Sequence, residues 1–240
     1  MKKNILFGMM LLAAGPLLAA DSNPKDDVKT AATALGNAAN YTWQTTVDMG
    51  ADSPFQMGPT DGKTEKDGYT TVSMTMMDNT SSIALKGTNA AVKTADNGWQ
   101  TVAEAMQGGG GGGFNPGMMI ARTAQNLKTP AVEAANLAGL AGDLKVDGDK
   151  ITGALTEDGA KAQLSFGGRR GGTPPTVANP KGTVTFWVAD GKLTKYSFHV
   201  TGTVSRGGND MDMDRTTTVV ISNVGTTKIE VPDDAKKKLQ

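Results

Sequence analysis

Side chains that commonly perform chemistry are few in this chain of 240 residues. It has no cysteine and one histidine, His199, which excludes thiol nucleophiles, disulfides, iron–sulfur clusters and sites with several histidines. His199 lies between Phe198 and Val200 in an alternating segment, and no Gly-x-Ser-x-Gly turn accompanies it. The sequence therefore predicts a surface or hydrogen-bonded strand histidine rather than a member of a catalytic triad.

The carboxylates contain one pattern that resembles a metal site. Asp210, Asp212 and Asp214 alternate as the first ligands of a calcium loop do. Arg215 and Ile221 stand where such a loop needs glycine and glutamate, which favours a charged hairpin tip. Many other aspartates adjoin glycine or begin apparent helices, where turn and cap chemistry explains them. We assign no catalytic residue, metal or cofactor, and a carboxylate-dependent hydrolase is only a weaker alternative.

Methionine provides a second group of candidate ligands. Thioethers select Cu(I) when three or more gather, and here Met74, Met76 and Met77 stand on one segment and Met211 and Met213 on another. Nothing in the sequence brings the two segments together. Unbranched thioethers also adapt to apolar ligands of variable shape, and we interpret these methionines as candidates for contact with such a ligand.

Two glycine-rich segments resemble nucleotide-binding or nucleic-acid-binding motifs. The glycines at 108–113 lack the lysine and the serine or threonine that complete a phosphate loop. Arg169 and Arg170 are flanked by paired glycines, as in RGG segments, but they occur in a single copy. Both segments are predicted to be flexible loops, at 108–113 and 167–181, and no nucleic-acid partner is expected.

Residues 1–20 have the features of a secretory signal peptide. Lys2 and Lys3 precede an apolar run, and small residues at Ala19 and Ala20 provide a cleavage point before Asp21. The run is too short to span a bilayer comfortably, so no integral membrane span is expected after its removal. The remaining chain has a formal charge of −2 and no cysteine to carry a lipid. A periplasmic or secreted protein follows, without a positive field to attract nucleic acid.

Residues 21–240 are expected to form one domain of α+β class, in which alternating strands are joined by tight turns. Asp-Gly and Asn-Gly pairs are strong hairpin signals. They occur at 61–62, 67–68, 97–98, 147–148 and 190–191. The strands that we predict lie near 41–49, 55–66, 69–77, 81–86, 90–94, 182–189, 192–204, 215–224 and 228–231. Tight turns without intervening helices favour an antiparallel meander.

Helical periodicity appears at the start of the domain and again in its middle. Helices are predicted at 28–39, 116–127, 130–140 and 157–164. Thr129 and Thr156 are the expected N-caps of the last two, so that Asp158-Gly159 falls in a first helical turn rather than a hairpin. The helical insertion at 116–141 must cover one face of the sheet.

This order of elements resembles the periplasmic lipoprotein carriers of the LolA type and the related LppX-type lipid-binding proteins. The matching pieces are a helix leading into Tyr41-Thr42-Trp43-Gln44, the helices after Pro116, and the hairpin from Thr185 to Leu193. The resemblance implies a strongly curved antiparallel sheet, an incomplete β-barrel, covered on one face by helices. It also implies acyl chains held between sheet and helices.

A half-barrel that holds a ligand needs an apolar sheet face that its own side chains do not fill. The candidate cavity residues are Trp43, Val47, Met74, Met76, Met118, Phe186 and Val188. The favoured function is a non-catalytic exported binding protein that carries a lipid or acylated ligand. The alternative is a structural or interaction module of the cell envelope, with a filled core and an envelope protein as its partner. Both functions stay open because a filled core and an empty pocket have the same sequence pattern.

Overall fold

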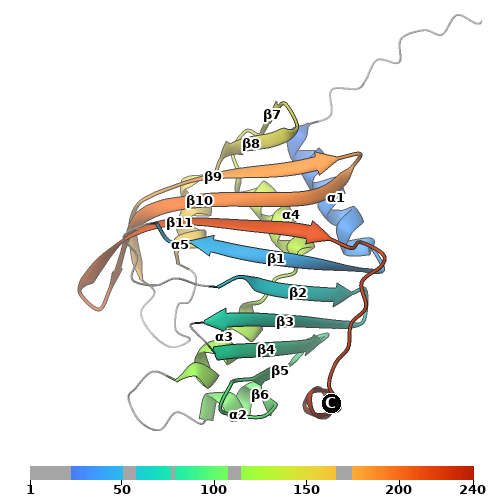
Figure 1. Cartoon of the computed structure of the whole chain (residues 1–240). Helices are drawn as coiled ribbons and strands as arrows, with labels where there is room; N and C mark the ends of the chain where they lie inside the picture. The colour runs from blue at the N-terminus through green and yellow to red at the C-terminus, as the bar shows by residue number, and fades with distance from the viewer. Residues whose placement is uncertain (1–22, 51–57, 77–78, 108–114, 166–174) are drawn as a thin grey trace, which may run out of the picture.

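The computed structural model describes residues 23–50, 58–76, 79–107, 115–165 and 175–240. Its strands form one antiparallel sheet of 11 strands in the order β6-β5-β4-β3-β2-β1-β11-β10-β9-β8-β7 (Figure 1). The two outer strands do not pair with each other, so the sheet is an open half-barrel. Together with the helices it confirms the predicted α+β class, a curved antiparallel sheet with a helical cover.

The sheet consists of two meanders that meet at its centre, where β1 pairs with β11. The first meander contains β1 (Asn40–Asp48), β2 (Thr60–Glu65), β3 (Tyr69–Met76), β4 (Asn79–Lys86), β5 (Asn89–Lys93) and β6 (Gln100–Thr101). The second contains β7 (Lys145–Asp147), β8 (Lys150–Ala154), β9 (Thr176–Ala189), β10 (Lys192–Arg206) and β11 (Asn209–Ser222). The chain thus crosses from one wing of the sheet to the other through the helical insertion.

Six helices are described, and their first turns follow from local sequence. They are α1 (Pro24–Asn37), α2 (Val102–Gln107), α3 (Pro116–Asn126), α4 (Pro130–Leu140), α5 (Glu157–Leu164) and α6 (Asp233–Lys238). Proline opens α1, α3 and α4, where its missing N–H costs nothing. Thr156 Oγ1 accepts from the Gly159 amide at 3.0 Å, as expected of an N-cap, whereas Thr129 caps α4 without a side-chain hydrogen bond.

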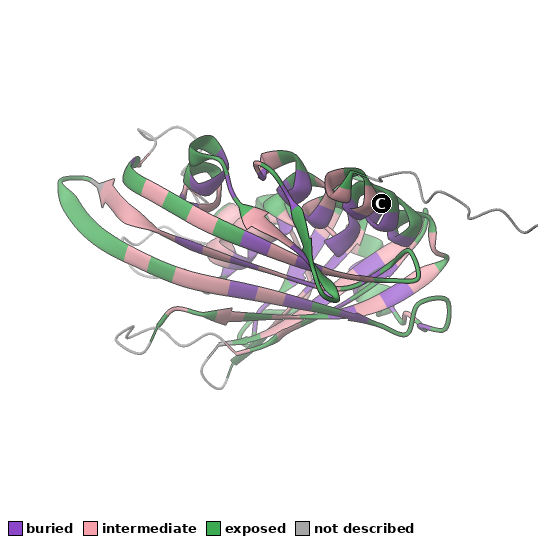
Figure 2. Ribbon diagram, turned by 90° about the horizontal axis from the view of Figure 1, so that it is seen from above, coloured by how far each residue is buried: buried purple, intermediate pink, exposed green. Residues whose placement is uncertain are grey.

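The main core lies between the concave face of the sheet and five helices. Figure 2 shows the helices on the inner side of the curved sheet. Buried apolar side chains come from every large strand and from α1, α2, α3, α4 and α5. The helices α1 and α4 pack against each other, α3 lies over β4 and β5, and α5 lies over β9 and β10. This arrangement places one continuous apolar face under a helical cover.

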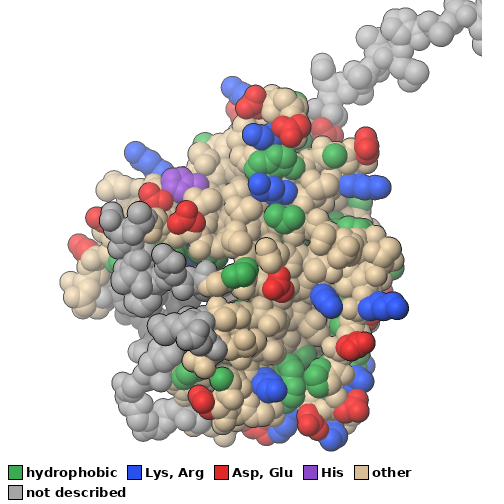
Figure 3. Space-filling view, in the orientation of Figure 1, with side chains coloured by type: hydrophobic (Ala, Val, Ile, Leu, Met, Phe, Trp, Pro, Cys, Tyr) green, Lys and Arg blue, Asp and Glu red, His purple; other side chains and the backbone are tan. Residues whose placement is uncertain are grey.

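A second, smaller core covers part of the convex face. Ala84 and Ala91 point away from the main core and contact Val231, Ala235 and Leu239 of the C-terminal segment. The rest of the convex face shows mainly uncharged polar side chains and backbone, with scattered charges (Figure 3). The wing formed by β4 and β5 is therefore packed on both sides.

The Asp61-Gly62 pair, predicted as a hairpin turn, lies inside β2 instead. Gly62 pairs with Trp43 on one side and Val72 on the other. A Cβ atom at position 62 would lie 2.1 Å from Cε2 of Trp43. This glycine makes room for the indole ring and does not turn the chain.

Two further predictions are wrong. Residues 228–231 alternate like a strand but pair with no strand of the described residues; they lead past the sheet to α6 (Figure 1). Residues 176–181, predicted as part of a loop, begin β9 and pair with the end of β10. A register shift between Thr201 and Thr203 accommodates Pro180 and the positive φ of Asn179, as β-bulges do.

Other element boundaries differ less. The pair 67–68 joins β2 to β3, and 190–191 joins β9 to β10, as expected. The pair 147–148 joins β7 and β8, which were not predicted as strands, and α2 and α6 were missed as well. The predicted loop at 108–113 and residues 55–57 of a predicted strand lie outside the described residues, as does the predicted signal peptide.

Candidate functional site

The candidate site is the concave face, whose side chains line up in rows across the strands. One row contains Met74, Thr60, Thr45, Val219, Tyr196 and Phe186 on six neighbouring strands. A parallel row contains Val47, Thr217, Phe198 and Val184. The predicted cavity residues Val47, Met74, Phe186 and Trp43 therefore share one face of the sheet. Side chains of one face that lie opposite each other on neighbouring strands are about 5 Å apart and form a continuous surface.

Part of this face is packed tightly, and we call it the closed region. Its defining residues are Trp43, Phe186, Leu193, Tyr196 and Ile221, all buried. Phe186 and Tyr196 are 0% exposed and their rings lie 6.4 Å apart, a favourable aromatic distance. The predicted cavity residues Trp43 and Phe186 thus belong to a filled part of the core.

The other part is only partly buried, and we call it the half-covered region. It consists of Val47, Met74, Val204 and Met213 of the sheet and Met118 of α3. The four sheet residues lie near the ends of β1, β3 and β10 and near the start of β11. The first three strands run in the same direction and β11 runs opposite, so these ends share one edge of the sheet. Met74, Val204 and Met213 still pack against the main core.

A polar group lies on the concave face between the two regions. The Tyr196 hydroxyl donates to Oε2 of Glu133 at 2.6 Å. Burial raises the pKa of Glu133, while the hydrogen bond from Tyr196 and the charges of Lys128 and Arg215 oppose this rise. Burial and the negative charge of Glu133 raise the pKa of Tyr196 well above its ordinary value. Burying a carboxylate in this position costs free energy. The hydrogen bond from the Tyr196 hydroxyl offsets part of that cost.

Arg215 completes this polar group from β11. One guanidinium nitrogen donates to the Gln163 carbonyl at the end of α5, at 2.7 Å. Its Nε is buried and has no hydrogen-bond partner. Burial lowers the pKa of Arg215, although Glu133 opposes this effect, and an arginine stays charged through the physiological range. The concave face therefore carries one buried cationic donor with unused hydrogen-bonding capacity.

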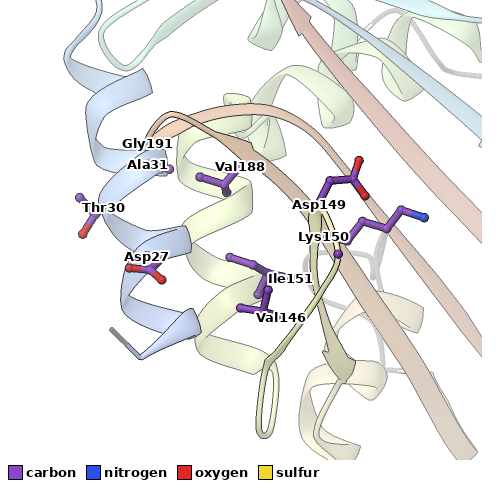
Figure 4. Close-up of a pocket in the computed structure, with 10 residues that line it drawn as sticks. Asp27, Thr30, Ala31, Val146, Asp149, Lys150, Ile151, Val188 and Gly191 are labelled. Atoms are coloured by element: carbon purple, nitrogen blue, oxygen red, sulfur yellow. The ribbon is translucent and has the colours of Figure 1, made fainter. Parts of the chain in front are cut away.

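At the opposite end of the concave face lies a pocket of about 360 Å³. It is formed by α1, the β7–β8 hairpin and the β9–β10 turn. Val146, Ile151 and Val188 point toward α1, whereas Lys150 points away from it (Figure 4). The predicted cavity residue Val188 thus lines a pocket, and its floor is apolar.

The seven predicted cavity residues do not form one site. Val47, Met74 and Met118 belong to the half-covered region, Trp43 and Phe186 to the closed region, and Val188 to the pocket beside α1. The backbone of Met76 ends β3, and its side chain lies outside the description. Glu133 and Arg215 were missed as site residues. A signal existed for Glu133, because it stands three residues after Pro130 and four before Leu137, on the apolar face of a helix.

The remaining candidates for chemistry lie on the other face of β10 and β11. His199 Nε2 and Asp214 Oδ1 are 2.8 Å apart, and Asp212 accepts from Thr203 at 2.8 Å. His199 is therefore a hydrogen-bonded strand histidine, as predicted. Within the described ranges, no three histidine, aspartate or glutamate side chains are placed to hold a metal ion together.

The site and fold define an open antiparallel half-barrel with a helical cover, and solved structures with a similar arrangement exist. Lipoprotein LppX from Mycobacterium tuberculosis matches with 14% identity and a TM-score of 0.47, over 88% of this chain and 99% of that one. LprF from Mycobacterium bovis matches with 13% identity and a TM-score of 0.44, over 88% and 97%. A DUF1329 family protein from Desulfovibrio piger matches with 10% identity and a TM-score of 0.33, over 91% and 100%.

No family model and no curated protein matches the sequence. Among the helices of the described segments, none is both long and apolar enough to cross a membrane.

Proposed function

We propose that this protein is a non-catalytic, exported binding protein that holds an apolar ligand, an acyl chain, on the half-covered region. The observation that carries the proposal is the uneven burial of one continuous apolar face. Met74, Val204 and Met213 pack on the main core yet keep part of their surface exposed, and Val47 on the same face is also only partly buried. An acyl chain laid over part of this region would be shielded from water there, and each buried methylene contributes about 0.8 kcal/mol.

The composition of this region suits a ligand of variable shape. Three of its five residues are methionines, whose flexible thioethers adjust to different partners. Met118 lies on α3, so a helix of the cover would contribute to binding together with the sheet. Arg215, two residues from Met213 on the same face of β11, would supply a cationic donor for an oxygen atom of the ligand's head group. The proposed ligand is therefore an amphiphile with an acyl chain and an oxygen-bearing head.

Export is part of the proposal and depends on the predicted signal peptide at 1–20. Release outside the cytoplasm would place the protein in the periplasm or beyond the cell, where a chain without cysteine needs no redox partner. N-terminal sequencing of the protein from culture fractions tests this, and a mature chain that begins at Asp21 is expected.

The ligand is tested by native mass spectrometry and lipid extraction of protein purified from its own compartment. Displacement of cis-parinaric acid, a fluorescent fatty acid, then measures affinity. Met74→Glu should weaken the binding of this probe by about tenfold or more, because it places a carboxylate against the acyl chain. Thr75→Glu is the matched control, since Thr75 is exposed on the other face of β3, and it should change affinity less than about twofold.

The second candidate function is an interaction module with a filled core, and the closed region favours it. Phe186, Tyr196, Val184 and Val200 are at most 1% exposed, as in an ordinary packed core. Purification of protein with only the apo mass, together with no saturable binding of cis-parinaric acid, would support this second function and reject the first.

A further inference from the structure

The convex face carries a pocket with both polar and apolar lining that the proposed function does not use. It measures about 480 Å³, within the range of roughly 300–1,000 Å³ that is usual for small-molecule sites. Its floor consists of outward-facing residues of β1–β4, and its walls are Trp99 and the C-terminal segment at residues 228–232. It is separated from the concave face by the sheet itself, so its ligand is independent of any acyl chain.

The floor of the pocket presents hydroxyl groups in two neighbouring rows. Thr42, Lys63 and Thr71 are register partners in one row, and Asp61, Ser73 and Ser82 are partners in the next. Gln44 Nε2 donates to Oδ1 of Asp61 at 2.9 Å, which fixes this carboxylate in place. Within the described residues, the side chains of Thr71, Ser73 and Ser82 make no hydrogen bond to protein, so they are available to a ligand.

The walls add charged groups and one aromatic ring. Glu230 and Lys228 project from the C-terminal segment, and Lys63 Nζ approaches the Lys228 carbonyl at 3.4 Å. Trp99 is half-buried: it packs on the small convex core with Ala84 and Ala91, and it also lines the pocket. Its position is fixed by packing, which gives a flat apolar surface beside a polar floor.

We propose that this convex pocket binds a saccharide of one or two rings. A sugar ring has an apolar face of C–H groups and an edge of hydroxyls that both donate and accept. The indole of Trp99 can pack against the apolar face of the sugar. The hydroxyl edge can form charge-assisted hydrogen bonds with Asp61, Glu230, Lys63 and Lys228. A purely apolar ligand would leave these polar groups unpaired, whereas a sugar satisfies both kinds of surface.

The experiment measures binding of maltose, trehalose and N,N′-diacetylchitobiose to the full chain by isothermal titration calorimetry. At least one should bind saturably, and Trp99→Ala should weaken it by about tenfold, which corresponds to roughly 1.4 kcal/mol. Trp187→Ala is the matched control. Trp187 is also half-buried, but its ring lies against Lys150 and Lys195, outside the pocket, so affinity should change less than about twofold.

A second variant guards against a folding defect in Trp99→Ala. Ser82→Gln fills the pocket without removing any packed side chain, and it should abolish binding while the melting temperature is kept. Failure of all three sugars to bind saturably would overturn the proposal. An equal loss of binding in Trp187→Ala and Trp99→Ala, or full binding by Ser82→Gln, would also overturn it.

Discussion

The closed and half-covered regions share one sheet face and one core, but differ in what covers them. Phe186 and Tyr196 belong to β9 and β10, which α1 contacts, and Tyr196 also reaches Glu133 of α4. Their side chains are 0% exposed, and Trp43 is 4% exposed. Val47, Met74 and Met213 lie toward the edge of the sheet and keep exposed surface. The difference shows that the same alternating pattern produces a filled core or a partly exposed surface according to which helices lie above it.

The largest effect is expected from Phe186→Ala, in the closed region. Removing this ring leaves a cavity that its packed neighbours cannot fill, and the loss of unfolding free energy should be about 4 kcal/mol. Met213→Ala, in the half-covered region, should cost only about 1 kcal/mol because water already reaches this side chain. Urea denaturation of the two variants measures both values. Equal losses would contradict the division of the face into two regions.

Gly62→Ala should cost about 3 kcal/mol, because the added methyl would overlap the Trp43 ring and force the closed region apart. Gly139→Ala is the control on α4, where an added Cβ meets nothing within 4 Å. That change should raise stability by about 0.5–1 kcal/mol through helix propensity. Thermal unfolding of both variants checks the signs. A harmless Gly62→Ala would mean that Trp43 can move and that the region is not closed.

A smaller effect is expected from the pH dependence of Glu133. Its pKa is raised in the folded protein, so the native state binds more protons than the unfolded chain in the window just above the ordinary carboxyl range. Stability therefore falls as the pH rises through that window. Glu133→Gln removes this titration, and its stability relative to the original protein should increase across denaturation series from about pH 4 to about pH 8.

Glu104 provides the opposite sign as a control. A hydrogen bond from Lys238 lowers the pKa of Glu104 at the surface. Its contribution to stability is present above the ordinary carboxyl pKa and is lost as the pH falls, so Glu104→Gln should lose relative stability as the pH rises. If the relative stabilities of Glu133→Gln and Glu104→Gln changed with pH in the same direction, Glu133 would not be buried between the regions.

The smallest effect is expected from Val188→Arg. This residue lines the open pocket beside α1, where a long side chain can extend its charge into water. The loss of unfolding free energy should be about 1 kcal/mol or less. Chemical denaturation gives this value. Cooperative loss of the fold would instead assign Val188 to the closed region.

Much of the fold could be predicted because its signals are local. Thr129-Pro130 and Thr156 define the starts of α4 and α5, and alternation defines most strands. The errors occur where a distant partner decides. The pair Asp61-Gly62 predicts a turn from local sequence alone. In the folded protein Gly62 instead makes room for the Trp43 ring, which comes from a different strand. Residues 228–231 alternate between apolar and polar side chains, but they would form a strand only by pairing with a neighbouring strand.

The candidate site was predictable only in part, for the same reason. Alternation identified the apolar face and residues such as Val47 and Met74, because side-chain direction follows from the strand period. It could not separate Phe186 from Met74, since the cover that distinguishes them is built from helices far along the chain. In the sequence Arg215 looks like one more charged residue of a hairpin. Its role depends on the fold, in which α5 brings the Gln163 carbonyl within hydrogen-bond distance.

The pairing of β1 with β11 has a consequence for the order in which the chain acquires structure. It joins the first strand to the last, and the hydrogen bond between Thr42 and Thr227 closes a loop of 185 residues. Until β11 has been synthesised, the first meander has no partner along its inner edge. Contacts of such long range form slowly, so the growing chain stays open while it is made. The two wings of the sheet therefore acquire a common core only after the last strand has been made.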